Sequence, residues 1–161
     1  MNNKFMQLAI KEALKAEREE EIPVGAVIVC DNKVISAAHN MREKLKDPTA
    51  HAEILAIREA AKKKNDWRLT GCTIYVTLEP CPMCASAILL ARINKIVFGA
   101  YDSENGACGS IINIPVTYKI FGYNASVEGG IMKDECKIIL QEFFKNRRNK
   151  YNNKGERWPS G

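Results

Sequence analysis

Apolar and polar positions follow two rhythms along the chain, and these rhythms predict helices and strands in alternation. Apolar residues spaced three or four apart predict helices over residues 3–20, 50–64, 80–91 and 134–148. Short apolar runs rich in β-branched residues predict strands over residues 26–30, 34–37, 73–78 and 96–100. The polar stretches over residues 40–49 and 102–110 are expected to be loops.

The order of these elements predicts an α/β fold. The first two strands are joined by the turn Asp31–Lys33 and form a β-hairpin, whereas the later strands alternate with helices. This order is typical of a mixed central sheet with helices on both faces. With 161 residues the chain is expected to form a single domain over residues 1–150, followed by a basic, flexible tail over residues 151–161.

Composition and hydropathy exclude several classes of protein. With 46% hydrophobic residues, the chain is not a disordered polyanion-binding segment. The apolar run over residues 88–91 stops at Arg92, far short of the roughly 20 residues that cross a bilayer, so no membrane partner is expected. The N-terminal helix becomes acidic by Glu17 and lacks the features of a signal peptide, which favours a cytoplasmic protein.

The positive charge is concentrated at the C-terminal end. The whole chain has 24 basic and 19 acidic residues, a net charge of +5. Residues 145–157 contain six basic residues and one acidic residue, so this stretch alone accounts for the net charge and the remainder is neutral. Such an end indicates an anionic partner, such as a nucleic acid.

The cysteines are expected to be reduced, because a cytosolic protein rarely keeps disulfides. Cys30 and Cys72 lie in apolar strand-like runs and are predicted to be small buried hydrophobic residues. Cys81 and Cys84 form a C-x-x-C pair, which in a cytosolic chain indicates metal binding or redox chemistry.

Three residues at two predicted helix starts have the pattern of a catalytic zinc site. His51 lies at the start of the second helix, and Cys81 and Cys84 lie one turn apart at the start of the third. Three protein ligands leave the fourth tetrahedral position for water, and helix N-termini favour thiolates. Glu53 is close enough to His51 to move a proton to and from that water.

Two other interpretations of these motifs remain open. A closed structural zinc site would need a fourth ligand, which His39 or another cysteine could supply. A redox-active C-x-x-C pair would not need the His51-Ala52-Glu53 element and usually follows the first strand of a βαβ unit. The two motifs together favour the catalytic site.

The combination H-x-E and P-C-x-x-C is the signature of zinc nucleoside and nucleobase deaminases. Longer stretches resemble the bacterial tRNA-specific adenosine deaminases, the TadA family. The resemblance lies in IPVGAVIV (22–29), PTAHAEILAI (48–57), WRLTGCTIYVTLEPCPMC (67–84), ARINKIVFGAYD (91–102) and EFFKNRR (142–148), and extends over nearly the whole chain.

The resemblance implies a three-layer α/β/α cytidine deaminase-like fold, a homodimer and one Zn²⁺ per subunit. The metal ligands would be His51, Cys81 and Cys84. The reaction would be the hydrolytic conversion of adenosine to inosine at the wobble position, 34, of a tRNA anticodon, with arginine tRNA and its anticodon stem-loop as the expected partner. Metal-activated water would attack C6 of the adenine, and Glu53 would be the catalytic proton shuttle.

Further positions carry over from the family as substrate contacts. Asn40 would hydrogen-bond the purine, Val24 would line the base pocket, and Asp102, Ser103 and Asn113 would meet the RNA. Without the family, Asn40 could equally be a turn residue and Val24 an ordinary core residue, and an ordinary loop position is the better explanation of Asp102.

The terminal helix carries the remaining RNA candidates. Because Phe143 and Phe144 are adjacent, only one of them can lie on a single core-facing stripe, and Phe144 is the predicted RNA contact. Lys145, Arg147 and Arg148 would neutralise phosphates, although a basic helix end also suits the helix dipole.

Two other functions compete with tRNA editing. One is a zinc-dependent deaminase of a free base or small nucleoside of the guanine or cytosine type. The other is a non-catalytic, zinc-stabilised binding module. The resemblance at the terminal helix and in the Asp102 loop favours the tRNA substrate.

Overall fold

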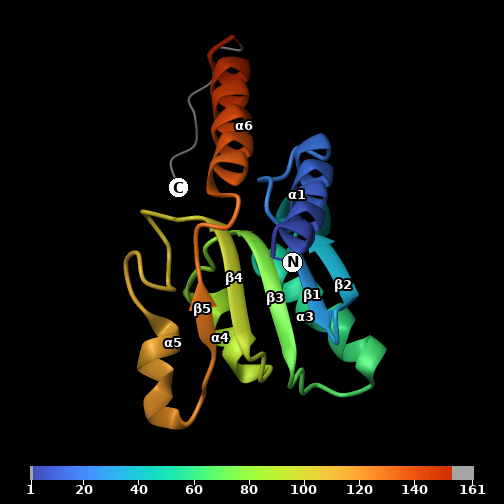
Figure 1. Cartoon of the computed structure of the whole chain (residues 1–161). Helices are drawn as coiled ribbons and strands as arrows, with labels where there is room; N and C mark the ends of the chain where they lie inside the picture. Colours follow the sequence, from blue (N-terminus) through green and yellow to red (C-terminus); the bar gives the residue numbers. More distant parts are fainter. Residues whose placement is uncertain (1, 154–161) are drawn as a thin grey trace.

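A mixed five-stranded sheet forms the centre of the protein, as the computed structural model of residues 2–153 shows (Figure 1). The strands are β1 (Gly25–Cys30), β2 (Lys33–His39), β3 (Cys72–Leu78), β4 (Lys95–Ala100) and β5 (Ser126–Glu128). They lie in the order β2-β1-β3-β4-β5, with β1 antiparallel to β2 and β3, and with β3, β4 and β5 parallel. The predicted hairpin and mixed sheet are therefore confirmed.

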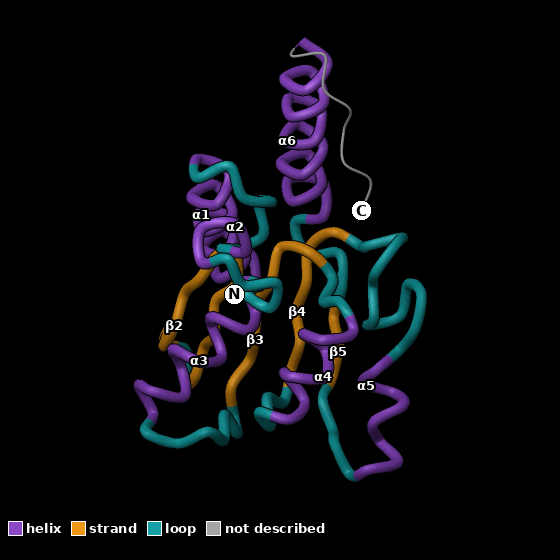
Figure 2. The backbone as a smooth tube through the Cα atoms, turned by 180° about the vertical axis from the view of Figure 1, so that it is seen from behind, coloured by secondary structure: helices purple, strands orange, loops and turns teal. Residues whose placement is uncertain are grey.

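Helices cover both faces of this sheet, which confirms the predicted α/β fold (Figure 2). The helices are α1 (Asn2–Arg18), α2 (Arg42–Leu45), α3 (Ala52–Lys64), α4 (Pro82–Leu90), α5 (Ile114–Thr117) and α6 (Lys133–Asn153), with a 3₁₀ helix η1 (Tyr118–Phe121) after α5. Two hydrophobic clusters separate the layers: α3 and α4 pack on one face, and α1 and the start of α6 pack on the other.

Alternation along the strands determines which cluster each residue joins. In β3, Ile74 and Val76 face α3 and α4, whereas Tyr75 between them packs with α1. In β4, Ile96 and Phe98 likewise face α3 and α4, whereas Val97 between them packs on the α1 side. Successive strand side chains point to opposite faces, so a sheet covered on both sides needs apolar residues at consecutive positions.

The structure differs from the expected elements in several short additions and in the length of the terminal helix. It adds β5, a three-residue strand that pairs with β4, the short helix α2 within the stretch 40–49 expected to be a loop, and the short helix α5 in a segment for which the pattern predicts no element. The terminal helix continues to Asn153, so the first residues of the predicted tail are helical; residues 154–161 lie outside the described part of the chain.

Cys30 and Cys72 form a disulfide, so their predicted role as unpaired buried residues is wrong. They are directly opposed at the end of the antiparallel β1–β3 pair, with their Cα atoms 4.6 Å apart. That separation lies within the usual range for a disulfide, and it follows from a strand pairing that the local sequence does not reveal.

No helix in the described range 2–153 is long and apolar enough to cross a membrane.

Gly25, the first residue of β1, allows α1 to lie close against the sheet. A Cβ atom at this position would overlap the backbone oxygen of Ala9 and the backbone nitrogen of Ala13 in α1. Neither atom can rotate away, so the helix and the sheet would have to separate.

We therefore expect Gly25→Ala to lower the free energy of unfolding by about 3 kcal/mol, the upper part of the usual range for overpacking. Gly122→Ala is the matched control, because a Cβ there meets nothing within 4 Å and only its left-handed backbone is strained. The control should cost about 1 kcal/mol. Urea unfolding of both variants measures the difference; equal losses would contradict the close packing.

Candidate metal centre and active site

The side chains of His51, Cys81 and Cys84 converge at the N-terminal ends of α3 and α4. Their ligand atoms all lie within 4.8 Å of one another. Nδ1 of His51 is 3.7 Å from Sγ of Cys81 and 3.5 Å from Sγ of Cys84. The predicted trio is thus brought together from segments 30 residues apart in the chain.

The backbone at the two helix starts explains why these side chains meet. His51 is the N-cap of α3 and Cys81 is the N-cap of α4, and both have an extended backbone. Neither side chain caps its own helix, so each can turn toward the other. Pro82 takes the first position of α4, where its missing N–H costs nothing, and Cys84 follows within the first turn.

Hydrogen bonds among the three side chains shift their pKa values and favour one thiolate, which suits the binding of a cation. The pKa of Cys81 is lowered to about 4, chiefly by its hydrogen bond with Cys84 and, against the opposing effect of burial, by the one with His51. The pKa of His51 is raised by its hydrogen bond with Cys81, and the pKa of Cys84 is raised by Cys81 and by burial. One thiolate therefore forms readily, and a metal ion would displace the remaining protons.

This donor set fits a zinc ion. Two cysteine sulfurs and one imidazole nitrogen are zinc ligands of ordinary type, and three of them leave one coordination position open. Within residues 2–153, the potential metal-binding cluster contains these three side chains. His39, the alternative fourth ligand, instead contacts Glu12 and Glu19, and Cys30 and Cys72 are bonded to each other. A closed four-ligand site thus has no support in the described residues.

Glu53 is buried next to this cluster, in the first turn of α3. Its side chain is 4% exposed. Burial raises the pKa of Glu53 to about 7, and the charge of Cys81 adds to that effect. A carboxyl group with such a pKa can both accept and donate a proton near neutral pH, which is what general acid–base catalysis needs.

Glu79, at the turn between β3 and α4, has a different role and is a structural residue. Its carboxylate accepts backbone N–H bonds from Asp102 at 3.1 Å, Cys108 at 3.0 Å and Ser110 at 3.1 Å, and it also bonds the Ser110 hydroxyl. The backbone N–H of Ala107 donates to the carbonyl of Pro80 at 2.9 Å. The loop over residues 102–110 is thereby fixed beside the metal centre.

Two of the predicted substrate contacts, Asp102 and Asn113, form turns in this structure. The Oδ1 atom of Asp102 accepts from the N–H groups of Glu104 and Asn105, both at 3.0 Å. The Oδ1 atom of Asn113 caps α5 by accepting from the N–H of Val116 at 3.2 Å. Ser103 is exposed at the tip of the same loop as Asp102.

Asn40 and Val24 are both buried, and the backbone joins them. The N–H of Asn40 donates to the carbonyl of Val24 at 3.1 Å, and the next residue, Met41, donates to the carbonyl of Ala50 at 3.0 Å. Ala50 directly precedes His51, so these contacts bring the Asn40 segment next to the metal centre.

The two adjacent phenylalanines of α6 differ in burial, as predicted. Phe143 is buried, and Phe144 beside it is half-buried, with the two ring centroids 5.4 Å apart. Lys145 and Arg148 are exposed, whereas Arg147 lies over the Phe143 ring and donates to the carbonyl of Glu20 at 2.9 Å. Part of the basic helix is therefore used to hold α6 against the end of α1, beyond the sheet (Figure 1).

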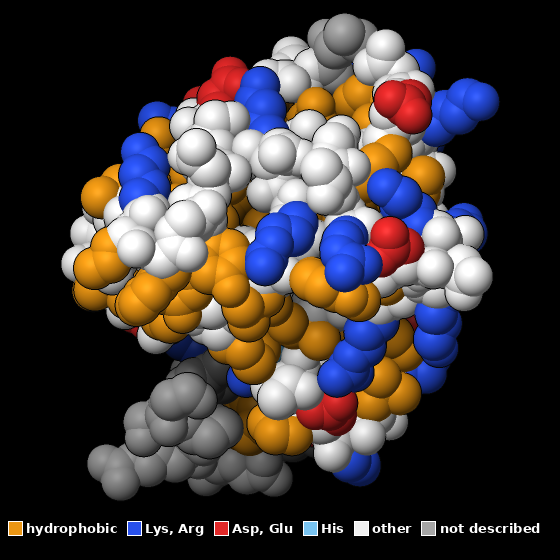
Figure 3. Space-filling model, turned by 90° about the horizontal axis from the view of Figure 1, so that it is seen from below, with side chains coloured by type: hydrophobic (Ala, Val, Ile, Leu, Met, Phe, Trp, Pro, Cys, Tyr) orange, Lys and Arg blue, Asp and Glu red, His pale blue; other side chains and the backbone are white. Residues whose placement is uncertain are grey.

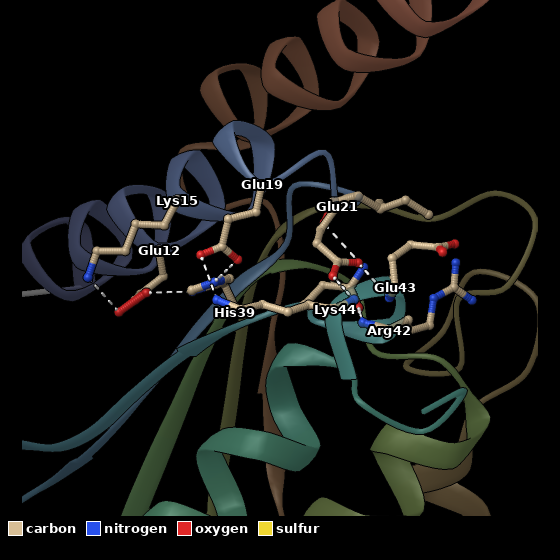
Figure 4. A network of polar contacts seen from close by, with 10 residues as sticks. Glu12, Lys15, Glu19, Glu21, His39, Arg42, Glu43 and Lys44 are labelled. Atoms are coloured by element: carbon tan, nitrogen blue, oxygen red, sulfur yellow. Dashed lines mark hydrogen bonds and ion pairs between the residues drawn. The ribbon is translucent and has the colours of Figure 1, made fainter. Parts of the chain in front are cut away.

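The sequence pattern does not reveal a group of carboxylates near the end of α1, of which Glu12 and Glu21 are buried and Glu19 is exposed (Figure 4). Glu12 and Glu19 contact the two ring nitrogens of His39, at 3.1 and 2.9 Å. Glu21 contacts the backbone of α2. The only sequence signal was the run of acidic residues before Pro23, which resembles an ordinary solvated helix end.

Comparison with known proteins identifies the family. Residues 1–100 match the family model for the cytidine and deoxycytidylate deaminase zinc-binding region. A protein of Bacillus subtilis (strain 168) named tRNA-specific adenosine deaminase is 47% identical over 146 residues, which cover 91% of this chain and 90% of that protein. The chain belongs to the tRNA-specific adenosine deaminase family.

Other relatives of this deaminase family agree. A tRNA-specific adenosine deaminase of Aquifex aeolicus (strain VF5) is 46% identical and covers 90% of this chain and 95% of its own length. A structure solved in a study of A-to-I editing by tRNA:A34 deaminases at the wobble position superposes with a TM-score of 0.81 at 42% identity. The match covers 85% of this chain and 99% of that chain, so the fold is the cytidine deaminase-like one.

Cys81→Ser tests the metal centre directly. We expect the purified variant to contain less than a tenth of the wild-type zinc, because an alcohol does not replace a thiolate as a ligand. Cys136→Ser is the control. This thiol is also buried, but it packs with α1 on the face of the sheet opposite α3 and α4. Elemental analysis after dialysis measures both. Full zinc in Cys81→Ser, or equal loss in the control, would rule out the assigned site.

Proposed function

We propose that this protein hydrolytically deaminates adenosine to inosine at the wobble position, 34, of a tRNA anticodon. The observation that carries the proposal is a three-ligand metal cluster with a buried carboxyl beside it, in a chain whose relatives are tRNA-specific adenosine deaminases. The competing function, deamination of a free base or small nucleoside, is not favoured, because the relatives at this level of identity are named for tRNA.

One zinc ion per subunit would be held by His51, Cys81 and Cys84. When bound, zinc supplies a Lewis acid that lowers the pKa of a coordinated water to about 7. Glu53 takes a proton from the attacking water and delivers it to N1 of the adenine, which makes C6 electrophilic. Glu53 then moves the remaining proton of the hydroxyl added at C6 to the amine, which leaves as ammonia while the C6 carbonyl forms, so the same carboxyl acts as base and as acid. Its burial near the cluster and its raised pKa support this role.

The base would be held by the two buried residues next to the metal centre. Val24 provides an apolar wall, and Asn40 offers both a donor and an acceptor to the purine edge. In this structure the Asn40 amide makes only long hydrogen bonds, 3.3 Å to the carbonyl of Ile22 and 3.4 Å from the N–H of Arg42. Such bonds can be exchanged for those of a base at small cost.

The RNA backbone would contact the loop and the terminal helix. Asp102, Ser103 and Asn113 meet the nucleotides around the flipped base, and Phe144 packs on the RNA while Lys145, Arg147 and Arg148 neutralise phosphates. The substrate is the anticodon stem-loop, and arginine tRNA is the expected species. The protein acts in the cytoplasm through a single domain over residues 1–150.

A homodimer is part of this proposal, and an exposed apolar surface supports it. Five large apolar side chains of the segment around α5 and η1 are exposed, with Ile120 at 75%: Ile111, Ile112, Val116, Ile120 and Phe121. Figure 3 shows hydrophobic side chains gathered on the side of the molecule where this segment lies. Exposed apolar side chains in such a cluster mark an interface.

Glu53→Ala separates an enzyme from a binding module. We expect turnover of an anticodon stem-loop to fall by roughly 10²- to 10⁴-fold, because the proton transfers lose their carrier, while zinc content and melting temperature stay the same. Glu59→Ala, an exposed carboxylate of the same helix, is the control. Inosine formation measured by chromatography gives the rates; an active Glu53→Ala variant would refute the mechanism.

Arg148→Ala tests whether α6 binds RNA. Removing one phosphate contact should weaken binding and reduce the slope of log affinity against log salt by about 0.7 to 0.9. Lys62→Ala changes an equally exposed charge at the far end of α3 and should leave the slope unchanged. Fluorescence anisotropy at several salt concentrations decides; equal slopes in Arg148→Ala and wild type would remove Arg148 from the interface.

Ile120→Asp tests the apolar surface. The wild-type chain should sediment at twice its 18.0 kDa mass, and the variant should sediment as a monomer because the interface would have to bury an unpaired charge. Val34→Asp, on the β-hairpin, should remain dimeric. A monomeric wild type would contradict the homodimer, and a dimeric Ile120→Asp would place its interface elsewhere.

A further inference from the structure

A buried carboxylate outside the metal centre holds the segment that carries Asn40. Glu21, between α1 and β1, is 1% exposed. Its oxygens accept two backbone hydrogen bonds from α2, one from the N–H of Glu43 at 3.0 Å and one from the N–H of Lys44 at 2.8 Å. Figure 4 shows the Glu21 side chain directed at this short helix.

The two N–H groups need an external acceptor. The first N–H groups of any helix lack a partner within the helix, and the N-cap of α2, Met41, makes no side-chain cap. Glu21 therefore caps α2 from a distant part of the chain. Its own position is fixed, because its backbone N–H donates to the carbonyl of Ala16 at 2.9 Å at the end of α1.

The position of α2 in turn determines how Asn40 is presented. The N–H of Arg42, the first residue of α2, donates to the side-chain oxygen of Asn40. The Asn40 side-chain nitrogen donates to the carbonyl of Ile22, the residue after Glu21. Glu21 thus fixes both segments that orient the Asn40 amide, and a shift of α2 would turn that amide within the base pocket.

We infer that Glu21 is a positioning residue for deamination, which acts on the substrate base through Asn40. This inference rests on the proposed function. A neighbouring contact provides the contrast: Glu12 is also a buried carboxylate of this network, but it contacts His39 and Lys15 and does not contact α2.

The test is a double-mutant cycle with Glu21→Gln, Asn40→Ala and the combination of both, assayed for kcat/KM on an anticodon stem-loop. Glutamine keeps the size of the side chain, but its NH₂ group cannot accept the second N–H bond. We expect Glu21→Gln to lower kcat/KM by about 10- to 100-fold, as for a small misplacement of a positioning group. The double variant should be no slower than Asn40→Ala alone, because the second change then has nothing left to misplace.

Glu12→Gln is the control and should keep kcat/KM within about threefold of the wild type, because Glu12 bonds His39 and Lys15 and none of the groups that orient the Asn40 amide. Zinc content and melting temperature are measured for each variant, and Glu21→Asp replaces Glu21→Gln if the latter does not fold. Losses that multiply in the double variant, or a Glu21 variant as active as the wild type, would overturn the inference. A wild-type protein that produces no inosine would instead refute the proposed function.

Discussion

The convergence of two helix N-termini is the constraint on which the site depends. His51 and Cys81 are both N-cap residues with an extended backbone, and neither side chain is used to cap its own helix. Their meeting, together with Cys84, creates a cluster in which one thiolate is stabilised before any metal binds. The sheet order, which places α3 and α4 on one face, makes this convergence possible.

The buried glutamates Glu21, Glu53 and Glu79 differ in their hydrogen bonds and therefore have different roles. Glu79 accepts three backbone N–H bonds and fixes the loop after β4, and Glu21 accepts two and fixes α2. Glu53, next to the metal ligands, instead has a pKa raised to about 7 by burial. Carboxylates with several N–H donors hold the walls of the site in place, and the carboxyl with the raised pKa is suited to carry protons.

The sequence predicts local features of this protein well and long-range features poorly. The proximity of His51, Cys81 and Cys84 could be predicted because both motifs fall at helix starts, which periodicity and Pro82 reveal. The disulfide between Cys30 and Cys72 was missed because it depends on β1 pairing with β3. The role of Glu21 could not be predicted, because its partners are backbone N–H groups of α2. Almost every residue type carries a backbone N–H, so the sequence does not show which of them donates to Glu21.

X-ray absorption at the zinc edge tests most directly whether this is an open catalytic metal centre. We expect two sulfur ligands at about 2.3 Å and two lighter ligands, one imidazole nitrogen and one water oxygen, at about 2.0 to 2.1 Å. The shell of lighter ligands should change when an anticodon stem-loop binds. Three or four sulfur ligands, or a shell that is indifferent to RNA, would indicate a closed structural site and contradict the account.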